Sequence, residues 1–532
     1  MRGVEFMKEM KKSTNDNLVA DFYEYCRERT IYIIFIIVVF FAVYGVWATH
    51  DIMTFDAEGF YVADQVEEWL ISWIGVGRWG FFLLKKCLRV MIINPYFSMA
   101  VFLTAFPFSA VFWSFFIYRA QENRVTAKVD VLIFSLVYLT HPIWNYQYIF
   151  RNQIEVFSIA LFILAFGMVL FAEWMNTGRF FPLILSFVTV TFVFGCYQGI
   201  TILYGEAVIV YYFLLLSTIG ESGESLKIFW LRLLRGFIFT VAAYGASSAI
   251  AEISRKIVNV GNGVWYLTFG IRWGKDPDSK CLHNIFVFMK EAVFGNPSIF
   301  TPIFAVLIFL LILWMIRRVL RRKKGAILQI PVAIVMILFC FVLDFAAGAR
   351  VIMRTQFLIA FCIAFLAEFL IVRIYGAFRE KASLLSAVGL SVALCLAVLP
   401  AIQQTDRCLY VMTKVLESDE ETLKGFYHEA LKQGAVPGMP VYIFGAKDFQ
   451  GTDAAKLTGS AGFERFAVPY LALIGTMHEN KTITAMRAFG CPVDYPNEEY
   501  RETARKIAET LPTWPLEGSV YVGDGVIIIH YA

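Results

Sequence analysis

The sequence predicts a polytopic α-helical membrane protein with about eleven transmembrane helices and a small α/β domain at its C-terminus. Of the 532 residues, 58% are hydrophobic and only 17% are charged, whereas soluble domains carry roughly 25% charged residues. The charges flank long apolar runs, which is typical of a chain surrounded by lipid. The net charge is only +4 and the basic residues lie beside these runs. We therefore interpret these basic residues as signals that set the membrane topology, and no nucleic-acid partner is expected.

Each apolar run of about 20 residues is taken as one membrane crossing. The clear runs lie at 30–49, 94–118, 154–173, 180–198, 200–217, 234–252, 299–316, 326–347, 355–374 and 383–401. A shorter run at 129–147 is needed to keep the topology consistent. The runs show no internal repeat, which disfavours the commonest transporter folds.

Basic residues set the orientation, because Lys and Arg concentrate in short cytoplasmic loops. With eleven crossings, all the basic segments fall on one side, including Arg317 to Lys324. The N-terminus is therefore expected in the cytoplasm and the C-terminus outside it. The predicted parts are a cytoplasmic segment (1–29), a transmembrane domain (30–402) with outer loops (50–93 and 253–298), and an extracytoplasmic α/β accessory domain (403–532).

The C-terminal tail shows alternating helix and strand patterns. Helical periodicity covers 408–433 and stops at Gly434, and a second amphipathic helix is expected at 498–511. The run 441–445 reads as a strand, and a hairpin is expected around Gly523-Asp524-Gly525. The tail has no nucleophile elbow, P-loop or metal motif, so we interpret it as an accessory domain.

The most unusual segment is the acidic loop after the first crossing. Asp56 and Glu58 lie among aromatic residues, and Arg78 follows in the Gly-rich run Gly75 to Gly80. A carboxylate beside apolar walls can act as a general base, and an Arg near it can bind phosphate through two hydrogen bonds. At a membrane surface this combination suits a lipid-linked phosphate. The alternative is a solvated acidic loop on the outer face.

Further polar residues map to the outer halves of the predicted helices, where they could line one cavity. Ionisable groups at this depth are costly and usually face a bundle interior. Structural ion pairs, such as Asp344 with Arg350, are the alternative. The candidate cavity-lining residues are Trp79, Asn145, Arg151, Tyr197, Gln198 and Asp344, with Arg350 and Arg354 in the next outer segment.

Taken in order along residues 30–400, these motifs resemble the GtrII-type glucosyltransferase family of bacterial and phage-encoded membrane proteins. The resemblance is carried by Phe55-Asp56-Ala57-Glu58, Gly77-Arg78, the aromatic segment Trp144 to Arg151, Tyr197-Gln198 and the Arg-rich segment at 350–354. The family pattern has adjacent acids after an aromatic residue, whereas Ala57 separates them here. The resemblance does not extend to the tail from about residue 403.

The resemblance implies a GT-C-like glycosyltransferase of the bacterial plasma membrane. Such an enzyme would move a hexose, with glucose as the first choice, from a polyprenyl-phosphate donor to a surface polysaccharide such as O-antigen. Asp56 or Glu58 would be the catalytic base, and Arg78, Arg350 and Arg354 would hold the donor phosphate. No cofactor is implied, although a divalent cation at the acidic outer loop stays open. The expected partners are the donor, the glycan acceptor and membrane lipid.

Two other classes of function remain open at this stage. A transporter or flippase for a lipid-linked or anionic substrate would use the same outer cavity but would need a path to the inside. A scaffold whose tail recruits partners is the third class, and the charged outer loop makes it the weakest.

Overall fold

The structure is a computed structural model that describes residues 17–49, 53, 57–62, 66–121, 128–222, 226–263, 270–296, 299–379, 383–445 and 479–531. The described residues are mostly helical, and seven of the helices among them are long and apolar enough to cross a membrane. A four-stranded sheet lies near the C-terminus. The prediction of a polytopic helical protein with a small C-terminal sheet is confirmed in these terms.

The seven candidate spans cover most of the predicted apolar runs. They are Thr30–Ala48, Pro95–Ala120, Arg151–Thr177, Gln198–Ile219, Ile303–Leu320, Leu358–Gly376 and Leu385–Lys432. The helices that form them are α3 (Thr30–Tyr44) with η1 (Gly45–Ala48), α6 (Pro95–Ala120), α9 (Ile154–Thr177), α11 (Gln198–Ser222), α14 (Ile303–Leu320), α17 (Leu358–Arg379) and α18 (Ser383–Lys432). The remaining runs contain α7 (Asp130–Leu139), α10 (Phe180–Phe194), α12 (Leu226–Ile257) and α15 (Ala326–Phe339).

The helices divide into a central and a peripheral group. In the apolar windows of α6, α9, α11 and α17, between 67% and 78% of the residues are buried. The corresponding share is only 17% to 28% for α3, α14 and α18. Large apolar side chains are exposed on the peripheral helices, for example Ile31, Phe309 and Leu396. Such a surface suits lipid, because water would penalise it.

Two of the predicted crossings are interrupted helices. The run 129–147 breaks at His141-Pro142 into α7 and α8 (Ile143–Tyr148), and His141 Nδ1 accepts a hydrogen bond from the Ile143 N–H at 3.2 Å. The run 326–347 breaks after α15, and α16 (Val342–Ala347) follows. At 1.5 Å per residue, α7 is about 15 Å long, which is about half of a bilayer core. Periodicity alone did not reveal these interruptions.

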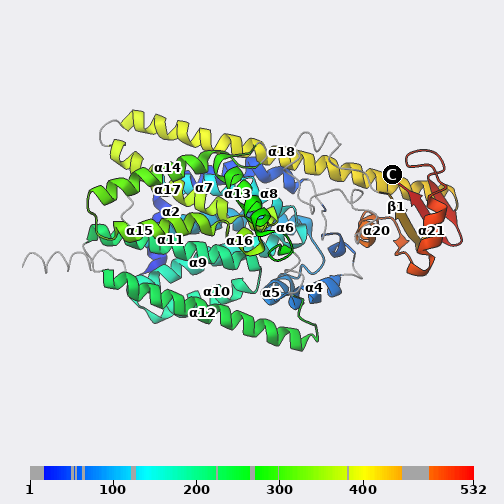
Figure 1. The fold of residues 1–532 in the computed structure, drawn as a ribbon, viewed down its shortest axis with the longest axis horizontal. Coiled ribbons are helices and arrows are strands. Elements are labelled where there is room, and N and C mark those ends of the chain that lie inside the picture. The colour runs from blue at the N-terminus through cyan, green and yellow to red at the C-terminus, as the bar shows by residue number, and fades with distance from the viewer. Residues whose placement is uncertain are drawn as a thin grey trace, which may run out of the picture.

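Short helices fill the two predicted outer loops. They are η2 (Glu58–Phe60), α4 (Val66–Gly75), α5 (Trp79–Leu88) and α13 (Asp278–Phe294), and η5 (Met353–Thr355) lies before α17. In Figure 1, α4 and α5 lie at the end of the bundle that faces the C-terminal sheet. We call this the sheet end of the bundle.

A single helix connects the bundle to the C-terminal domain. The 50 residues of α18 run without a break through the predicted boundary at 402 and would extend over about 75 Å. Figure 1 shows α18 passing along the bundle and into the domain. It ends at Lys432, and Gly434 follows with a φ of +92°, a backbone conformation that favours glycine after a helix.

The C-terminal sheet has the strand order β2-β1-β4-β3, with β1 (Met439–Phe444), β2 (Val493–Asp494), β3 (Val520–Gly523) and β4 (Val526–His530). β1 is parallel to β2 and β4, whereas β3 and β4 form the predicted antiparallel hairpin. Its turn residues Asp524 and Gly525 both have positive φ, as a two-residue hairpin turn requires. The described residues of the domain also form α20 (Glu479–Ala488), which sequence periodicity did not predict, η8 (Glu498–Tyr500) and α21 (Arg501–Ala508).

Buried ion pairs fix the other end of the bundle, where α2 (Leu18–Glu28) lies. Arg29 Nε lies 2.7 Å from Asp130 Oδ1 and Arg29 Nη2 lies 2.9 Å from Oδ2, so the pair is bidentate. The two side chains are only 2% and 0% exposed. Arg119 pairs in the same region with Asp21, at 2.7 Å, and with Glu173. These arginines therefore hold helices together, in addition to any part in topology.

Replacing Arg29 with alanine should destabilise the protein strongly, because Asp130 would remain as a buried charge without its partner. We expect Arg29→Ala to lower the free energy of unfolding in detergent micelles by about 3–5 kcal/mol. Arg27→Ala is the matched control, since Arg27 and Glu24 form an ion pair whose side chains are 62% and 57% exposed. That change should cost about 0–1 kcal/mol, and equal losses for the two variants would contradict this account.

Candidate functional site

Of the acidic loop, Met53, residues 57–62 and the residues from Val66 onward are described, so Asp56 lies outside the described residues. Glu58 begins the short helix η2 and is fully buried. The next residue, Gly59, lies against the indole of Trp69 on α4, and a Cβ at this position would come within 2.8 Å of the ring. The Phe60 carbonyl accepts a hydrogen bond from the Ile93 N–H at 3.3 Å. Glu58 is therefore held in a tightly packed turn, and not in a solvated loop.

Phe60 connects this turn to α5. Its ring packs edge-on against Trp69 and Trp73, with centroids 6.1 and 5.8 Å away. On its other side, Lys85 Nζ lies 5.5 Å from the Phe60 centroid. Lys85 is fully buried and forms an ion pair with Glu155 near the start of α9, which is equally buried. Desolvated charges of this kind must be paired to be tolerated.

The sequence interpretation did not select Lys85 or use Glu155 as a site residue. The spacing could have identified Lys85, because Arg78 at the N-cap of α5, Phe81 and Lys85 are three and four residues apart and so share one helix face. Lys85, and not its neighbour Lys86, continues the helix face that begins at Arg78. Its partner on α9 could not be read from spacing, since the two residues are 70 positions apart.

The structure brings Arg78 together with Tyr197 and Gln198. Arg78 Nε donates to Gln198 Oε1 at 2.8 Å, and Gln198 Nε2 donates to the Val76 carbonyl at 2.6 Å. The guanidinium carbon lies 4.7 Å from the Tyr197 ring centroid and 5.1 Å from that of Trp73. The turn before α11 thus fixes the Gly-rich turn before α5.

Arg151 begins η3 (Arg151–Gln153), directly before α9, and Arg354 lies in η5. Arg151 is 1% exposed, and its guanidinium lies 5.0 Å from the centroid of Trp47. Arg354 lies 4.3 Å from the centroid of Phe150, the residue directly before Arg151. Arg151 thus lies four residues before Glu155 in the chain, and Arg354 contacts the segment before α9 through Phe150. We call Lys85, Arg151, Glu155 and Arg354, together with Glu58, the polar cluster.

The other predicted site residues have mainly structural contacts. Trp79 Nε1 donates to the Ser247 carbonyl at 3.2 Å, and its ring occupies the space beside Gly195. Asn145 Nδ2 lies 3.5 Å from the Thr405 carbonyl of α18. Trp79 and Asn145 therefore join helices to one another.

Asp344 and Arg350 do not pair with each other. Asp344 accepts hydrogen bonds from Gln356 Nε2 at 2.7 and 2.8 Å and from the Val351 N–H at 2.8 Å. Arg350 instead lies 3.5 Å from Glu291 on α13. Asp344 thus stabilises the segment 351–356, which includes Arg354. Arg350 instead contributes to the contact with α13.

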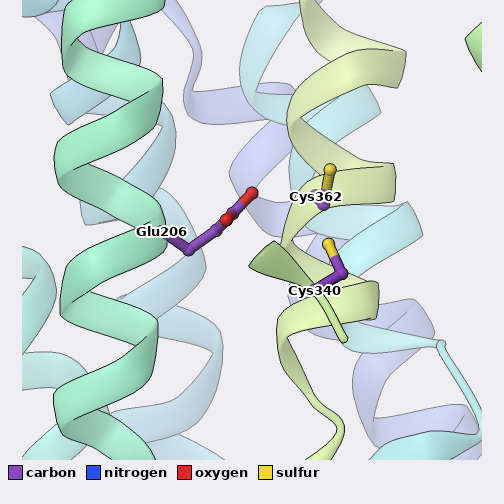
Figure 2. Close-up of side chains that lie close together, drawn as sticks. All are labelled: Glu206, Cys340 and Cys362. Atoms are coloured by element: carbon purple, nitrogen blue, oxygen red, sulfur yellow. The ribbon is translucent and has the colours of Figure 1, made fainter. Parts of the chain in front are cut away.

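A second buried polar group lies inside the bundle. Glu206 on α11, Cys340 after α15 and Cys362 on α17 place their carboxylate and sulfur atoms within 4.8 Å of one another. Figure 2 shows the Glu206 carboxyl group directed toward the two sulfur atoms. Among the described residues, neither oxygen of Glu206 has a hydrogen-bond partner. Thiols and a carboxylate are a donor set for Zn²⁺ more than for Mg²⁺, but an uncharged carboxyl group beside two thiols explains the same arrangement.

Among the described residues of the acidic loop, no comparable group occurs. Of its acids, Glu58, Glu67 and Glu68 are described, and no three potential ligands come together there within the described part of the chain. An apolar groove between α14 and α15 is lined by aliphatic and Met side chains alone, including Leu311, Met315 and Ile334. The groove therefore offers no group that could bind a charged ligand.

If Glu206 carries an uncharged carboxyl group, glutamine can replace it with little loss. We expect Glu206→Gln to change the free energy of unfolding by less than about 1.5 kcal/mol, and purified wild-type protein to contain no bound zinc. Unfolding in detergent and elemental analysis of the purified protein check both points. One zinc per chain, absent from Glu206→Gln and retained in the control Cys395→Ser, would contradict the interpretation, since Cys395 is exposed.

Comparisons with known proteins do not assign the chain to a family. No protein-family model matches the sequence, and no curated protein matches it.

Proposed function

We propose that the chain is a membrane glycosyltransferase that moves a hexose, with glucose as the first choice, from a polyprenyl-phosphate donor to a cell-surface polysaccharide. The observation that carries the proposal is the polar cluster. It combines a buried carboxylate, Glu58, with the cations Lys85, Arg151 and Arg354 at one end of an apolar bundle. The GtrII-type motifs supply the substrate class, and the bacterial plasma membrane is the expected location.

The charges of the cluster suit an anionic lipid headgroup. Glu155 offsets the charge of Lys85, while Arg78, Arg151 and Arg354 supply three guanidinium groups beside aromatic rings. These groups would suit a phosphate, since charge-assisted hydrogen bonds from arginine are among the strongest that proteins make. The apolar surface of the helices would hold the polyprenyl chain in the bilayer.

In the proposed reaction, the carboxylate of Asp56 or Glu58 takes the proton from an acceptor hydroxyl group. The acceptor oxygen then forms a bond to the anomeric carbon, while the bond between that carbon and the phosphate oxygen breaks. The electron pair leaves with the polyprenyl phosphate, whose added negative charge Arg78 and Arg354 would stabilise. No metal or nucleotide takes part in this scheme.

A transporter or flippase for a lipid-linked or anionic substrate is the second candidate. The interruptions between α7 and α8 and between α15 and α16 favour it, because transporters often bind their substrates at broken helices. The two candidates differ in their product. Only the transferase forms a new glycosidic bond in detergent solution, where there are no two compartments.

The base is tested with amide variants. Glu58→Gln and Asp56→Asn keep the size of the side chain and remove its basicity, so the variant that lacks the base should lose about 10²–10⁴-fold in turnover. The assay uses purified protein, radiolabelled polyprenyl-phosphate-glucose and the host glycan. Glu67→Gln and Glu68→Gln are the controls, because both side chains are exposed on α4. Unchanged transfer by both test variants would reject the mechanism and favour the transporter.

The phosphate site is tested by the donor affinity of arginine variants. Arg78→Ala and Arg354→Ala should each weaken donor binding by about 10–100-fold, as expected for the loss of charged hydrogen bonds. The lysine variants should lose less, because they retain the charge without the planar fork. Arg255→Ala is the control, since Arg255 pairs with Glu252 and lies 3.5 Å from the Gly75 carbonyl beside the same turn.

The same assay can separate the roles of Arg350 and Arg354. Because Arg350 pairs with Glu291, we expect Arg350→Ala to weaken donor binding less than Arg354→Ala. Wild-type donor binding by Arg78→Ala and Arg354→Ala alike would remove the phosphate role from both residues.

A further inference from the structure

The C-terminal domain shares a hydrophobic core with the acidic loop. Met53 and Ala57 are 5% and 0% exposed. They belong to the same buried cluster as Phe426 of α18 and Ile483 and Met486 of α20. This cluster lies on one face of the C-terminal sheet, since the alternate β1 residues Val441 and Ile443 also belong to it. The loop that carries the candidate base is therefore packed into the domain that sequence analysis treated as an accessory.

A second contact joins α20 to the wall behind Glu58. Lys481 Nζ lies 5.0 Å from the ring centroid of Trp69. The same indole occupies the space beside Gly59. Burial lowers the pKa of Lys481 to about 7, as expected for an ammonium group removed from water. Trp69 thus lies between the lysine of the C-terminal domain and the turn that contains Glu58.

The helix that carries Lys481 is firmly anchored within its own domain. Glu479, the first residue of α20, accepts a hydrogen bond from the Ile443 N–H at 3.0 Å. Its other oxygen pairs with Arg501 at 2.5 Å, and Arg501 also pairs with Glu498 at 2.8 Å. Because α18 is continuous from the bundle into the domain, α20 has a fixed support from which to hold the loop.

We infer that the C-terminal domain contributes to the candidate site by holding the turn at 57–61 in place. Within this arrangement, Lys481 is a positioning residue that acts through Trp69. The role in catalysis rests on the proposed function, whereas the role in holding the turn does not. In Figure 1, α20 is the domain helix nearest the sheet end of the bundle, where α4 lies.

The holding role can be measured without any activity. Hydrogen exchange of the full-length protein in micelles is compared for wild type, Ile483→Ala and Ile528→Ala. Ile483 is a 0% exposed residue of α20 in the shared core, and Ile528 is equally buried in the cluster on the opposite face of the sheet. We expect Ile483→Ala to speed exchange at 57–61 and 66–75 by at least tenfold, and Ile528→Ala to act mainly on α21 and β4.

Faster exchange in α20 of Ile483→Ala, with unchanged exchange at 57–61, would overturn the holding role. The same holds if Ile528→Ala loosens the turn as much as Ile483→Ala does. Because this experiment needs no substrate, its result stands even if the transferase proposal fails.

The positioning role is measured by sugar transfer. Lys481→Met should lower kcat by at least tenfold with little change in the KM for the donor, since the lysine would position the base and not bind phosphate. Lys481→Arg should restore most of the rate, because arginine also packs its charge over an indole. Lys506→Met is the matched control, since Lys506 is exposed on α21 of the same domain. Wild-type kcat in Lys481→Met, or no rescue by arginine, would overturn this role.

Discussion

The buried ion pair between Lys85 and Glu155 is the contact on which the polar cluster depends. It fixes α5, a helix of the segment between α3 and α6, against the start of α9 in the centre of the bundle. Neither side chain is exposed, so each charge needs the other to be tolerated. Phe60 lies on Lys85, and the turn with Glu58 is positioned through this ring. Arg151 lies one helical turn before Glu155, which brings the arginines to the same place.

The same rule explains why other charges occur where they do. Arg29 with Asp130, and Arg119 with Asp21 and Glu173, form ion pairs at the opposite end of the bundle. Charged groups thus gather at the two ends of the helices, and the apolar side chains occupy the length between them. Glu206 differs, because its carboxyl oxygens have no hydrogen-bond partner among the described residues. An uncharged carboxyl group reconciles this position with the cost of burying a charge.

The C-terminal domain changes how the first outer segment is understood. A loop with acids and glycines would be expected to be solvated and mobile when considered alone. Here Ala57 is buried in the core of a distant domain, and Gly59 lies against Trp69. Because α18 runs without a break from the bundle into the domain, it fixes the position of the domain beside this turn. The turn that contains Glu58 is consequently packed against α4 and α20, which are more than 400 residues apart in the chain.

The sequence by itself determined the membrane class, the positions of the apolar helices and the C-terminal hairpin, because periodicity, apolar length and turn residues are local properties. It also selected Arg78, Tyr197 and Gln198 as separate motifs, which the tertiary structure brings together. The breaks at His141-Pro142 and after α15, the partners of Lys85 and Asp344, and the burial of Ala57 were decided by tertiary structure alone. Each of these depends on which helices become neighbours, and in an apolar bundle many pairings satisfy the hydrophobic pattern equally well, whereas only one pairs the buried charges.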